Sequence, residues 1–203
     1  AVPATKPINK SVGIDMGITT FATLSDSSTI ENPRHFKRAQ EQLALAQFKY
    51  SRTQKGSKNR EKQKRKVAIK HEYVANCRKD YLHKASDAIT KRFDTICIED
   101  LNVSGMSKKA KPKQDEDGKY LPNGQSRKSG LNKSILDAGW GMFANMLEYK
   151  SRWRGNNFIK VDRFFPSSKM CSCCKTVNKD LKLSDRTWTC SHCGTEHQRD
   201  PLA

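Results

Sequence analysis

The order of hydrophobic and polar positions along the chain predicts strands that alternate with helices. Short runs rich in β-branched and aromatic residues, bounded by turn residues, are typical of strands. Such runs occur in three segments: residues 11–24, which hold two strands on either side of a turn at Gly17, residues 94–98, and residues 158–165. The run at 94–98 is expected to be buried inside a parallel or mixed sheet.

Apolar positions spaced by three and four residues predict the helices. This spacing occurs over residues 37–50, residues 74–93 and residues 132–153. Gly56 interrupts the pattern between the first two, which predicts two helices joined by a basic turn. Residues 25–33 and 104–130 show no periodicity and are expected to be loops. Strands that alternate with helices predict an α/β fold with a mixed sheet flanked by helices.

The charge of the chain points to a polyanionic partner. The 203 residues include 39 Lys and Arg against 21 Asp and Glu, a formal net charge of +18, and nucleic acid is the commonest partner of such a surplus. The candidate nucleic-acid-binding residues form one basic segment: Lys49, Arg52, Lys55, Lys58, Arg60, Lys62, Lys64, Arg65, Lys66 and Lys70. This segment lacks the aromatic face of a membrane-surface helix, and no apolar run approaches the roughly 20 residues of a transmembrane helix. A membrane partner is therefore not expected.

Two cysteine pairs, each with two intervening residues, predict a zinc site. The pairs are 15 residues apart, and their members are Cys171, Cys174, Cys190 and Cys193. This spacing is typical of a tetrahedral, structural zinc ribbon, which leaves no open position for a catalytic water. His192 and His197 are expected on the surface rather than among the ligands. The odd total of seven cysteines, without an apolar signal segment, favours a reducing, cytoplasmic compartment over disulfides.

Three acidic residues stand where strand ends or the ribbon would place them together. Asp15 closes the first predicted strand, Glu99 closes the buried strand, and Asp200 follows the last cysteine. Three carboxylates suit two Mg²⁺ ions, which prefer oxygen ligands and assist phosphodiester hydrolysis. Other roles stay open, because Asp15 before a turn, Glu99 beside Asp100, and Asp200 could equally be turn, capping or surface residues.

Several segments together resemble a known family. They are GIDMG, ICIEDLNVSGM, LDAGWGMFANMLEYKSRWRG, VDRFFPSSKMCSCC and KDLKLSDRTWTCSHCGTEHQRD. They resemble the TnpB (OrfB) proteins of insertion sequences, which are relatives of the type V CRISPR effectors. The resemblance implies a RuvC-like nuclease of the RNase H fold with an inserted zinc ribbon, which cleaves target DNA under the direction of a guide RNA.

The resemblance also implies roles for particular residues. Asp15, Glu99 and Asp200 match the catalytic carboxylates that hold two Mg²⁺ ions, and the four paired cysteines match the zinc ligands. The implied domains are a nuclease core over 11–165, with a helical basic insertion at 37–93 and a flexible loop at 104–130, a zinc ribbon over 166–196, and a truncated last nuclease segment over 197–203. The basic segment would line the path of the guide–target heteroduplex or of a DNA strand.

Two alternatives stay open, the first because of departures from the family pattern. Gln198 replaces a usual Asp, and Pro201 to Ala203 follow Asp200 where the family continues into a helix. The first alternative is therefore a nucleic-acid-binding zinc-ribbon fragment with an incomplete, inactive nuclease site. The second is a DDE-type transposase, which uses three carboxylates for strand transfer. Trp140 and Trp153, on a helical stripe, are expected in the core, whereas Trp188 is a candidate platform for stacking bases.

Overall fold

The computed structural model describes residue 7 and residues 9–182, 185 and 187–198. These residues divide between two compact units. The first unit contains residues up to 32, residues 86–102 and residues from 144 onward, and the second contains residues 33–85 and 103–143. Among the described residues, no helix is both long and apolar enough to cross a membrane.

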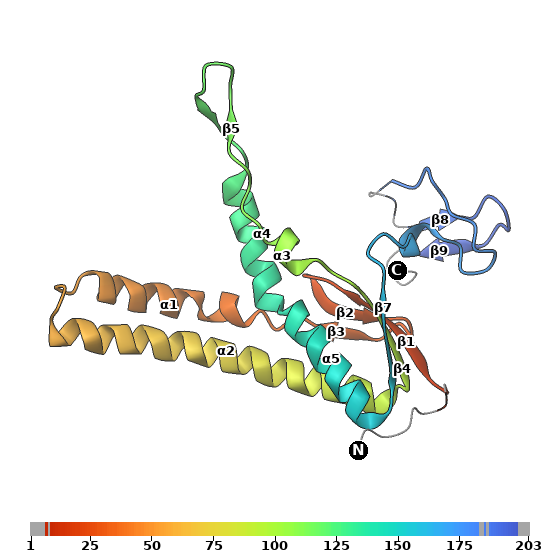
Figure 1. The fold of residues 1–203 in the computed structure, drawn as a ribbon, viewed down its shortest axis with the longest axis horizontal. Helices are drawn as coiled ribbons and strands as arrows, with labels where there is room; N and C mark the ends of the chain where they lie inside the picture. The colour runs from red at the N-terminus through yellow and green to blue at the C-terminus, as the bar shows by residue number, and fades with distance from the viewer. Residues whose placement is uncertain (1–6, 8, 183–184, 186, 199–203) are drawn as a thin grey trace. The chain divides into compact units, whose positions relative to one another are not determined.

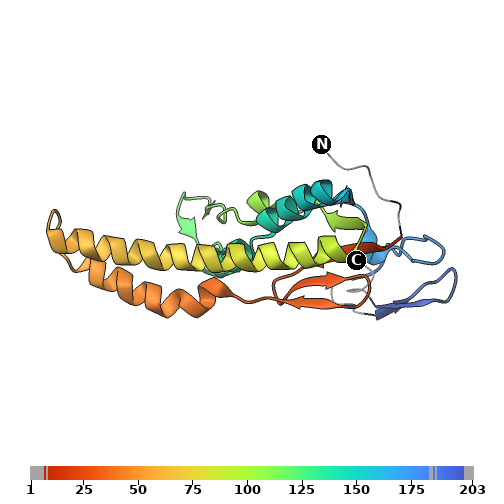
Figure 2. The same cartoon turned by 90° about the horizontal axis from the view of Figure 1, so that it is seen from below.

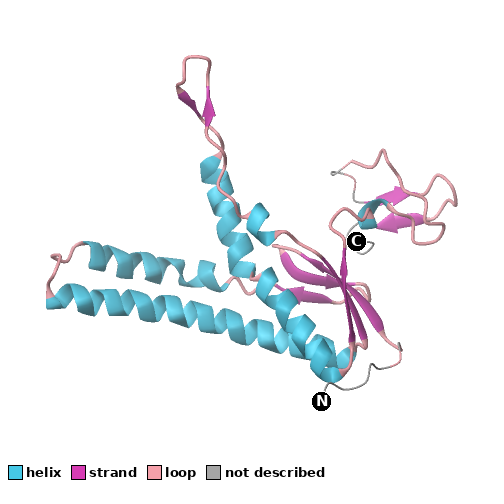
Figure 3. Cartoon of the chain, viewed as in Figure 1, coloured by secondary structure: helices cyan, strands magenta, loops and turns pink. Residues whose placement is uncertain are grey.

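A five-stranded mixed sheet forms the centre of the first unit (Figures 1 and 3). Its strands are, in spatial order, β3 (Thr29–Glu31), β2 (Thr20–Leu24), β1 (Ser11–Met16), β4 (Thr95–Glu99) and β7 (Asn157–Val161). The pairs β1–β4 and β4–β7 are parallel, whereas β1–β2 and β2–β3 are antiparallel. The prediction of an α/β fold with a mixed sheet is therefore confirmed.

Two strand boundaries differ from the prediction. The segment 25–33 was expected to be a loop, but it contains β3, because a turn with Ser27 at a φ of 66° brings Thr29 opposite Thr23. Three residues are too few for an alternating pattern to be visible. β7 ends at Val161 rather than near residue 165, since Phe165 N donates to Asp162 O at 2.9 Å and turns the chain.

Buried polar side chains join the last turns of two helices in this unit, α2 (Lys58–Arg92) and α5 (Trp140–Arg154). Lys150 Nζ donates to Ser86 Oγ at 2.9 Å. Asn156 Nδ2 donates to the carbonyl oxygens of Thr90 and Phe93, at 2.6 and 2.9 Å. Unpaired polar groups are costly to bury, so these hydrogen bonds fix where the two strands that follow, β4 and β7, begin.

A helical hairpin dominates the second unit, where α1 (His35–Ser51) lies beside the first part of α2 (Figures 1 and 2). The two helices are joined by a turn in which Gly56 has a φ of 80°, so the prediction of two helices around Gly56 is confirmed. Leu43, Ala46 and Val74 form buried apolar positions between the helices.

Two predictions for the second unit are wrong. The segment 104–130 was expected to be a loop, but it contains most of α3 (Val103–Met106), the hairpin of β5 (Lys113–Gln114) and β6 (Tyr120–Leu121), and the start of α4 (Gln125–Ala138). These elements are too short or too polar to show a period. The segment 132–153 was expected to be one helix, but Gly139 separates α4 from α5 with a φ of 72°.

Candidate metal centres and nucleic-acid interface

The parallel pairing of β1 and β4 brings two predicted site residues to the same sheet edge. The register pairs Ile14 with Ile98, and Asp15 and Glu99 are the next residue of each strand. Both side chains line one cavity of about 260 Å³, which Asp162, after the end of β7, also lines. The carboxyl ends of parallel strands meet at one edge, so this convergence is a consequence of the topology.

The electrostatics of this edge favour a bound cation. Partial burial raises the pKa of Glu99, and the nearby carboxylates of Asp15 and Asp100 raise it further. The carboxylate of Asp100 has its own partner, because Arg163 Nη2 donates to Asp100 Oδ2 at 2.6 Å. Crowded carboxylates are what a hard divalent cation such as Mg²⁺ neutralises, so Asp15 and Glu99 fit a magnesium site.

The turn that follows Asp15 depends on glycine. Gly17 N donates to Phe21 O at 3.1 Å and closes the turn from β1 to β2. A Cβ atom at Gly17 would lie 2.7 Å from Thr20 O, closer than real Cβ contacts come. This explains why a glycine stands two residues after the aspartate.

Two further aspartates bear on the prediction of three carboxylates at this edge. Asp200 lies outside the described residues. Asp162 lines the cavity but was not among the predicted site residues. Its position at the end of the strand 157–161 was the available signal, which the prediction of a longer strand over 158–165 hid. Asp162 Oδ1 accepts a hydrogen bond from Phe164 N at 2.8 Å, so this carboxylate also shapes the turn after β7.

The four predicted zinc ligands form one cluster. The Sγ atoms of Cys171, Cys174, Cys190 and Cys193 all lie within 4.8 Å of one another. Sγ atoms of the two pairs approach to 3.5 Å, between Cys171 and Cys193 and between Cys174 and Cys190. A tetrahedral zinc site with Zn–S bonds of about 2.3 Å needs S–S separations of about 3.8 Å. The cluster therefore fits a structural zinc ion.

The two cysteine knuckles have the same internal hydrogen bonds. Cys171 N donates to Thr176 O, and Cys190 N donates to Thr195 O, both at 2.8 Å. Each threonine hydroxyl also lies near the second sulfur of its knuckle, at 3.3 Å from Cys174 Sγ and 3.2 Å from Cys193 Sγ. The hydrogen bond with the Thr176 hydroxyl, helped by that with its backbone, lowers the pKa of Cys174 to about 5. A thiolate is the form that binds zinc.

A buried histidine supports the cluster, contrary to the prediction. His192 is exposed as expected, but His197 is 6% exposed and its Nε2 lies 3.1 Å from Cys171 Sγ. It belongs to β9 (Glu196–Gln198), where it pairs with Trp188 of β8 (Thr187–Thr189). No sequence pattern indicated that His197 is buried against Cys171, because the pairing of β8 with β9 creates this contact.

The tryptophans divide between core and surface. Trp140 is 3% exposed, as predicted. Trp153 was expected in the core but is 70% exposed, because it lies on the outer side of the last turn of α5, next to Tyr149. Trp188 was a candidate stacking platform but is buried with Leu181 in the core of the ribbon, so it offers no face to a base.

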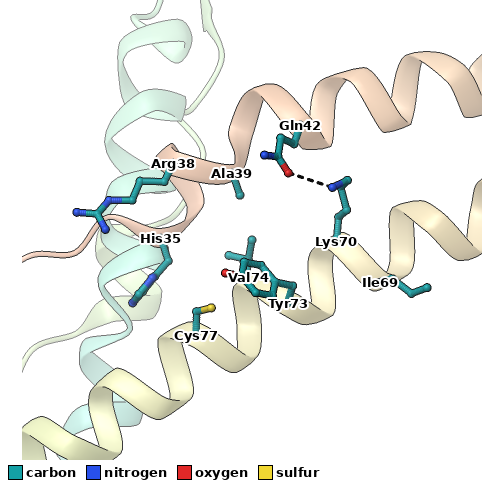
Figure 4. A pocket seen from close by; sticks show the side chains of 9 residues that line it. All are labelled: His35, Arg38, Ala39, Gln42, Ile69, Lys70, Tyr73, Val74 and Cys77. Carbon is teal, nitrogen blue, oxygen red and sulfur yellow. Dashed lines mark hydrogen bonds between the residues drawn. The ribbon is translucent and has the colours of Figure 1, made fainter.

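Most of the basic segment is exposed on the hairpin of α1 and α2. Eight of the ten predicted residues are exposed: Lys49, Arg52, Lys55, Lys58, Lys62, Lys64, Arg65 and Lys66. The other two have structural partners. Arg60 Nη1 donates to Thr53 O at 2.8 Å and its guanidinium stacks over Tyr50, while Lys70 Nζ donates to Gln42 Oε1 at 3.0 Å beside a cavity of about 660 Å³ (Figure 4).

Comparison with protein families decides which family this chain represents. Residues 1–110 match the OrfB_IS605 family, described as "Probable transposase". The chain belongs to the OrfB_IS605 family. Residues 140–203 match the TNB domain of Cas12f1-like proteins, and this part contains the four-cysteine cluster. The resemblance to TnpB proteins is therefore confirmed.

Curated relatives and solved structures extend this assignment of the OrfB_IS605 chain. A Streptomyces pristinaespiralis protein named "Putative RNA-guided DNA endonuclease" is 43% identical over 93% of this chain and 42% of its own length. The Escherichia coli protein named "Putative RNA-guided DNA endonuclease InsQ" is 40% identical over 91% of this chain and 44% of its own length. The chain thus spans about two fifths of the length of these relatives. A mimivirus TnpB-like protein is 29% identical over 72% of this chain and 25% of its own.

Two solved structures share the fold of this OrfB_IS605 chain. A CRISPR-Cas12f ternary complex superimposes with a TM-score of 0.54 at 16% identity, over all of this chain and 39% of that one. A complex of Cas12f1 with a single guide RNA and target DNA superimposes with a TM-score of 0.53 at 18% identity, over 90% of this chain and 35% of that one.

Proposed function

We propose that this chain forms the nuclease part of a transposon-encoded, RNA-guided DNA endonuclease, with Asp15 and Glu99 as ligands of catalytic Mg²⁺. The observation that carries the proposal is the convergence of Asp15 and Glu99 at the ends of neighbouring parallel strands, where partial burial and, after it, the nearby carboxylate of Asp15 raise the pKa of Glu99. The names of the curated relatives support it. Asp200, beyond the described residues, is the proposed third carboxylate.

The proposed fold follows the same residues. Residues 11–165 would form a RuvC-like core of the RNase H fold, with the basic helical segment at 37–93 and the segment 104–130 as insertions. Residues 166–196 would form the zinc ribbon, and residues 197–203 the last nuclease segment. The sheet order, with a parallel β1–β4–β7 part and an antiparallel β1–β2–β3 part, supports this assignment.

Two bound Mg²⁺ ions would stabilise the attacking and leaving oxygens of phosphodiester hydrolysis. Asp15 and Glu99 line the cavity at the strand ends, where they would hold such ions. Lys175 lines the same cavity and places a positive charge beside it, which favours the approach of a phosphate. The four cysteine thiolates would saturate a zinc ion, which would hold the ribbon in shape and leave no open position for the hydrolysis.

The partners proposed for the chain are a guide RNA and target DNA. The exposed lysines and arginines of α1 and α2 would contact phosphates, which supplies affinity without reading sequence. Binding by such contacts weakens steeply as the salt concentration rises. The guide-dependent activity of the whole protein is part of the proposal, since the relatives are more than twice as long as this chain.

The experiment is cleavage of end-labelled single-stranded DNA by the chain with Mg²⁺ and with EDTA. Asp15→Asn and Glu99→Gln, which keep the shape of each side chain, are expected to reduce cleavage to the EDTA level. Asp80→Asn is the matched control, because Asp80 forms an exposed surface pair with Lys84, and it should cleave as the wild type does.

Three outcomes would contradict the proposal. Cleavage that persists in Asp15→Asn, or in EDTA, would remove the metal site from Asp15. Salt-dependent DNA binding by an intact chain that leaves the DNA uncut would favour the nucleic-acid-binding fragment. Joined rather than merely cut strands would favour a DDE-type transposase.

A further inference from the structure

Two aromatic side chains lie exposed beside the carboxylate cavity. Phe164 is 84% exposed and Phe165 is 47% exposed. Phe165 lines the cavity together with Asp15 and Glu99, and Phe164 is its neighbour in the chain. Phenylalanine is among the residues most often buried, so two exposed neighbours at this place need an explanation.

The backbone under the two rings is held in a defined turn. Asp162 accepts twice, from Phe164 N at its Oδ1 (2.8 Å) and from Phe165 N at its carbonyl oxygen (2.9 Å). Ser167 N then donates to Phe165 O at 2.8 Å. Pro166 lies between Phe165 and Ser167, and its pyrrolidine ring restricts its own φ angle. The exposure of the rings is therefore a property of an ordered turn.

The charges around the turn select the kind of ligand that an aromatic surface here would bind. Lys175 lines the same cavity, whereas Arg163, which precedes Phe164, pairs with Asp100 at 2.6 Å. The chain as a whole carries a net charge of +18. Proteins that bind single-stranded nucleic acid combine a positively charged path for the backbone with aromatic side chains on which unpaired bases stack. A base within a duplex offers no free face for such stacking.

We propose that Phe164 and Phe165 form an aromatic platform on which an unpaired base of single-stranded DNA stacks beside the carboxylate cavity. The platform would hold the strand so that a neighbouring phosphate lies at Asp15 and Glu99. This inference rests on the proposed function for the choice of DNA as the ligand. Stacking needs no metal, however, so binding can be measured where cleavage is impossible.

The experiment measures the affinity of the chain for a fluorescent single-stranded oligonucleotide, and for the matching duplex, in EDTA at fixed salt concentration. Phe164→Ala is expected to weaken single-strand binding about tenfold, the range typical of one stacked base, and to leave duplex binding unchanged. Phe164→Tyr keeps the ring and should bind as the wild type does, whereas Phe164→Leu keeps an apolar side chain without a ring and should bind as Phe164→Ala does. Tyr120→Ala is the matched control, because Tyr120 is also exposed, at 71%, but lies in the β5–β6 hairpin.

A single abasic nucleotide, moved along the oligonucleotide, tests the contact itself. At one position the abasic site should weaken wild-type binding as much as Phe164→Ala does, and the two changes together should cost no more than either alone. Additive losses at every position, equal losses for duplex and single strand, or unchanged binding by Phe164→Ala would overturn the platform.

The two proposals fail separately. A wild-type chain that shows the platform effect but no cleavage would refute the nuclease function alone. Normal Mg²⁺-dependent cleavage with wild-type single-strand affinity in Phe164→Ala would refute the platform alone.

Discussion

The Nε2 atom of His197 lies 3.1 Å from the Sγ atom of Cys171, inside the ribbon. The histidine ring also packs against Trp188, with ring centroids 4.8 Å apart and the ring planes tilted by 43°. In a zinc-bound ribbon the sulfur is a thiolate, and a ring N–H at this distance can donate to it. Such hydrogen bonds to metal ligands orient the ligand and tune its affinity for the metal.

We therefore expect His197→Phe to lower zinc affinity by about 10- to 100-fold, the usual effect of losing a partner of a metal ligand. Phenylalanine keeps a ring against Trp188 but provides no donor. Competition with a chromophoric chelator measures the affinity. His192→Phe is the control, because His192 is exposed in the same ribbon, and it should bind zinc normally. Wild-type affinity in His197→Phe would show that only ring packing matters.

Among the described acidic residues of the second unit, we expect the substitution of Asp137 to lower the stability of the protein most. Its carboxylate accepts from Phe36 N at 3.0 and 3.1 Å and pairs with Arg78 at 2.8 Å. It thus serves as the N-terminal cap of α1, because the residue at the cap position, Arg34, makes no side-chain capping hydrogen bond. Asp137→Ala should lower the free energy of unfolding by about 2–4 kcal/mol, since it also removes the carboxylate that pairs with Arg78 Nη2 and leaves Arg78 only its bond to the backbone carbonyl of residue 137.

Urea unfolding followed by helical circular dichroism measures this effect. The control is Asp80→Ala, which removes an exposed pair with Lys84 and should change the free energy of unfolding by less than about 0.5 kcal/mol. Equal effects of the two substitutions would refute the capping role of Asp137.

Two glycines should respond oppositely to alanine. Gly139 has a φ of 72°, and a Cβ there would lie 3.1 Å from Leu82 Cδ1, so Gly139→Ala should destabilise the protein by about 1–2 kcal/mol. Gly130 is exposed within α4, and a Cβ would meet nothing within 4 Å. Gly130→Ala should stabilise by about 0.5–1 kcal/mol through the higher helix propensity of alanine. The same thermal or urea melts compare both, and a stabilising Gly139→Ala would contradict the structure.

The contribution of Asp87 to stability should depend on pH. Hydrogen bonds from Lys91, then from Arg154, lower the pKa of Asp87 from 3.8 to about 2. A lowered pKa adds stability that is complete above the ordinary value and is lost as the pH falls through the lowered one. Asp87→Asn should therefore lower the urea midpoint at pH 7 and lower it less at pH 3. An equal decrease of the urea midpoint at pH 7 and at pH 3 would contradict this prediction. The pKa of Asp87 itself can be measured from the NMR shift of its carboxyl carbon.

Local patterns were sufficient for the elements whose signals are themselves local. The alternation of Val12 and Ile14, the β-branched run in β4 and the break at Gly56 predicted β1, β4 and the α1–α2 hairpin. The hairpin of β5 and β6 and the strand β3 were missed, because two or three residues cannot display a period. The separation of α4 from α5 was missed because an apolar stripe continues past Gly139, and only its positive φ ends the helix.

By itself the sequence determined which four cysteines form the cluster that fits zinc, the positive charge and the family, because cysteine spacing, composition and motif residues are properties of the chain alone. Tertiary structure decided which side chains meet. Parallel pairing of β1 with β4 brings Asp15 beside Glu99 across 84 positions of the chain, and the pairing of β8 with β9 buries His197 against Cys171. Strand register sets such contacts, and register depends on how the whole sheet packs rather than on any local pattern.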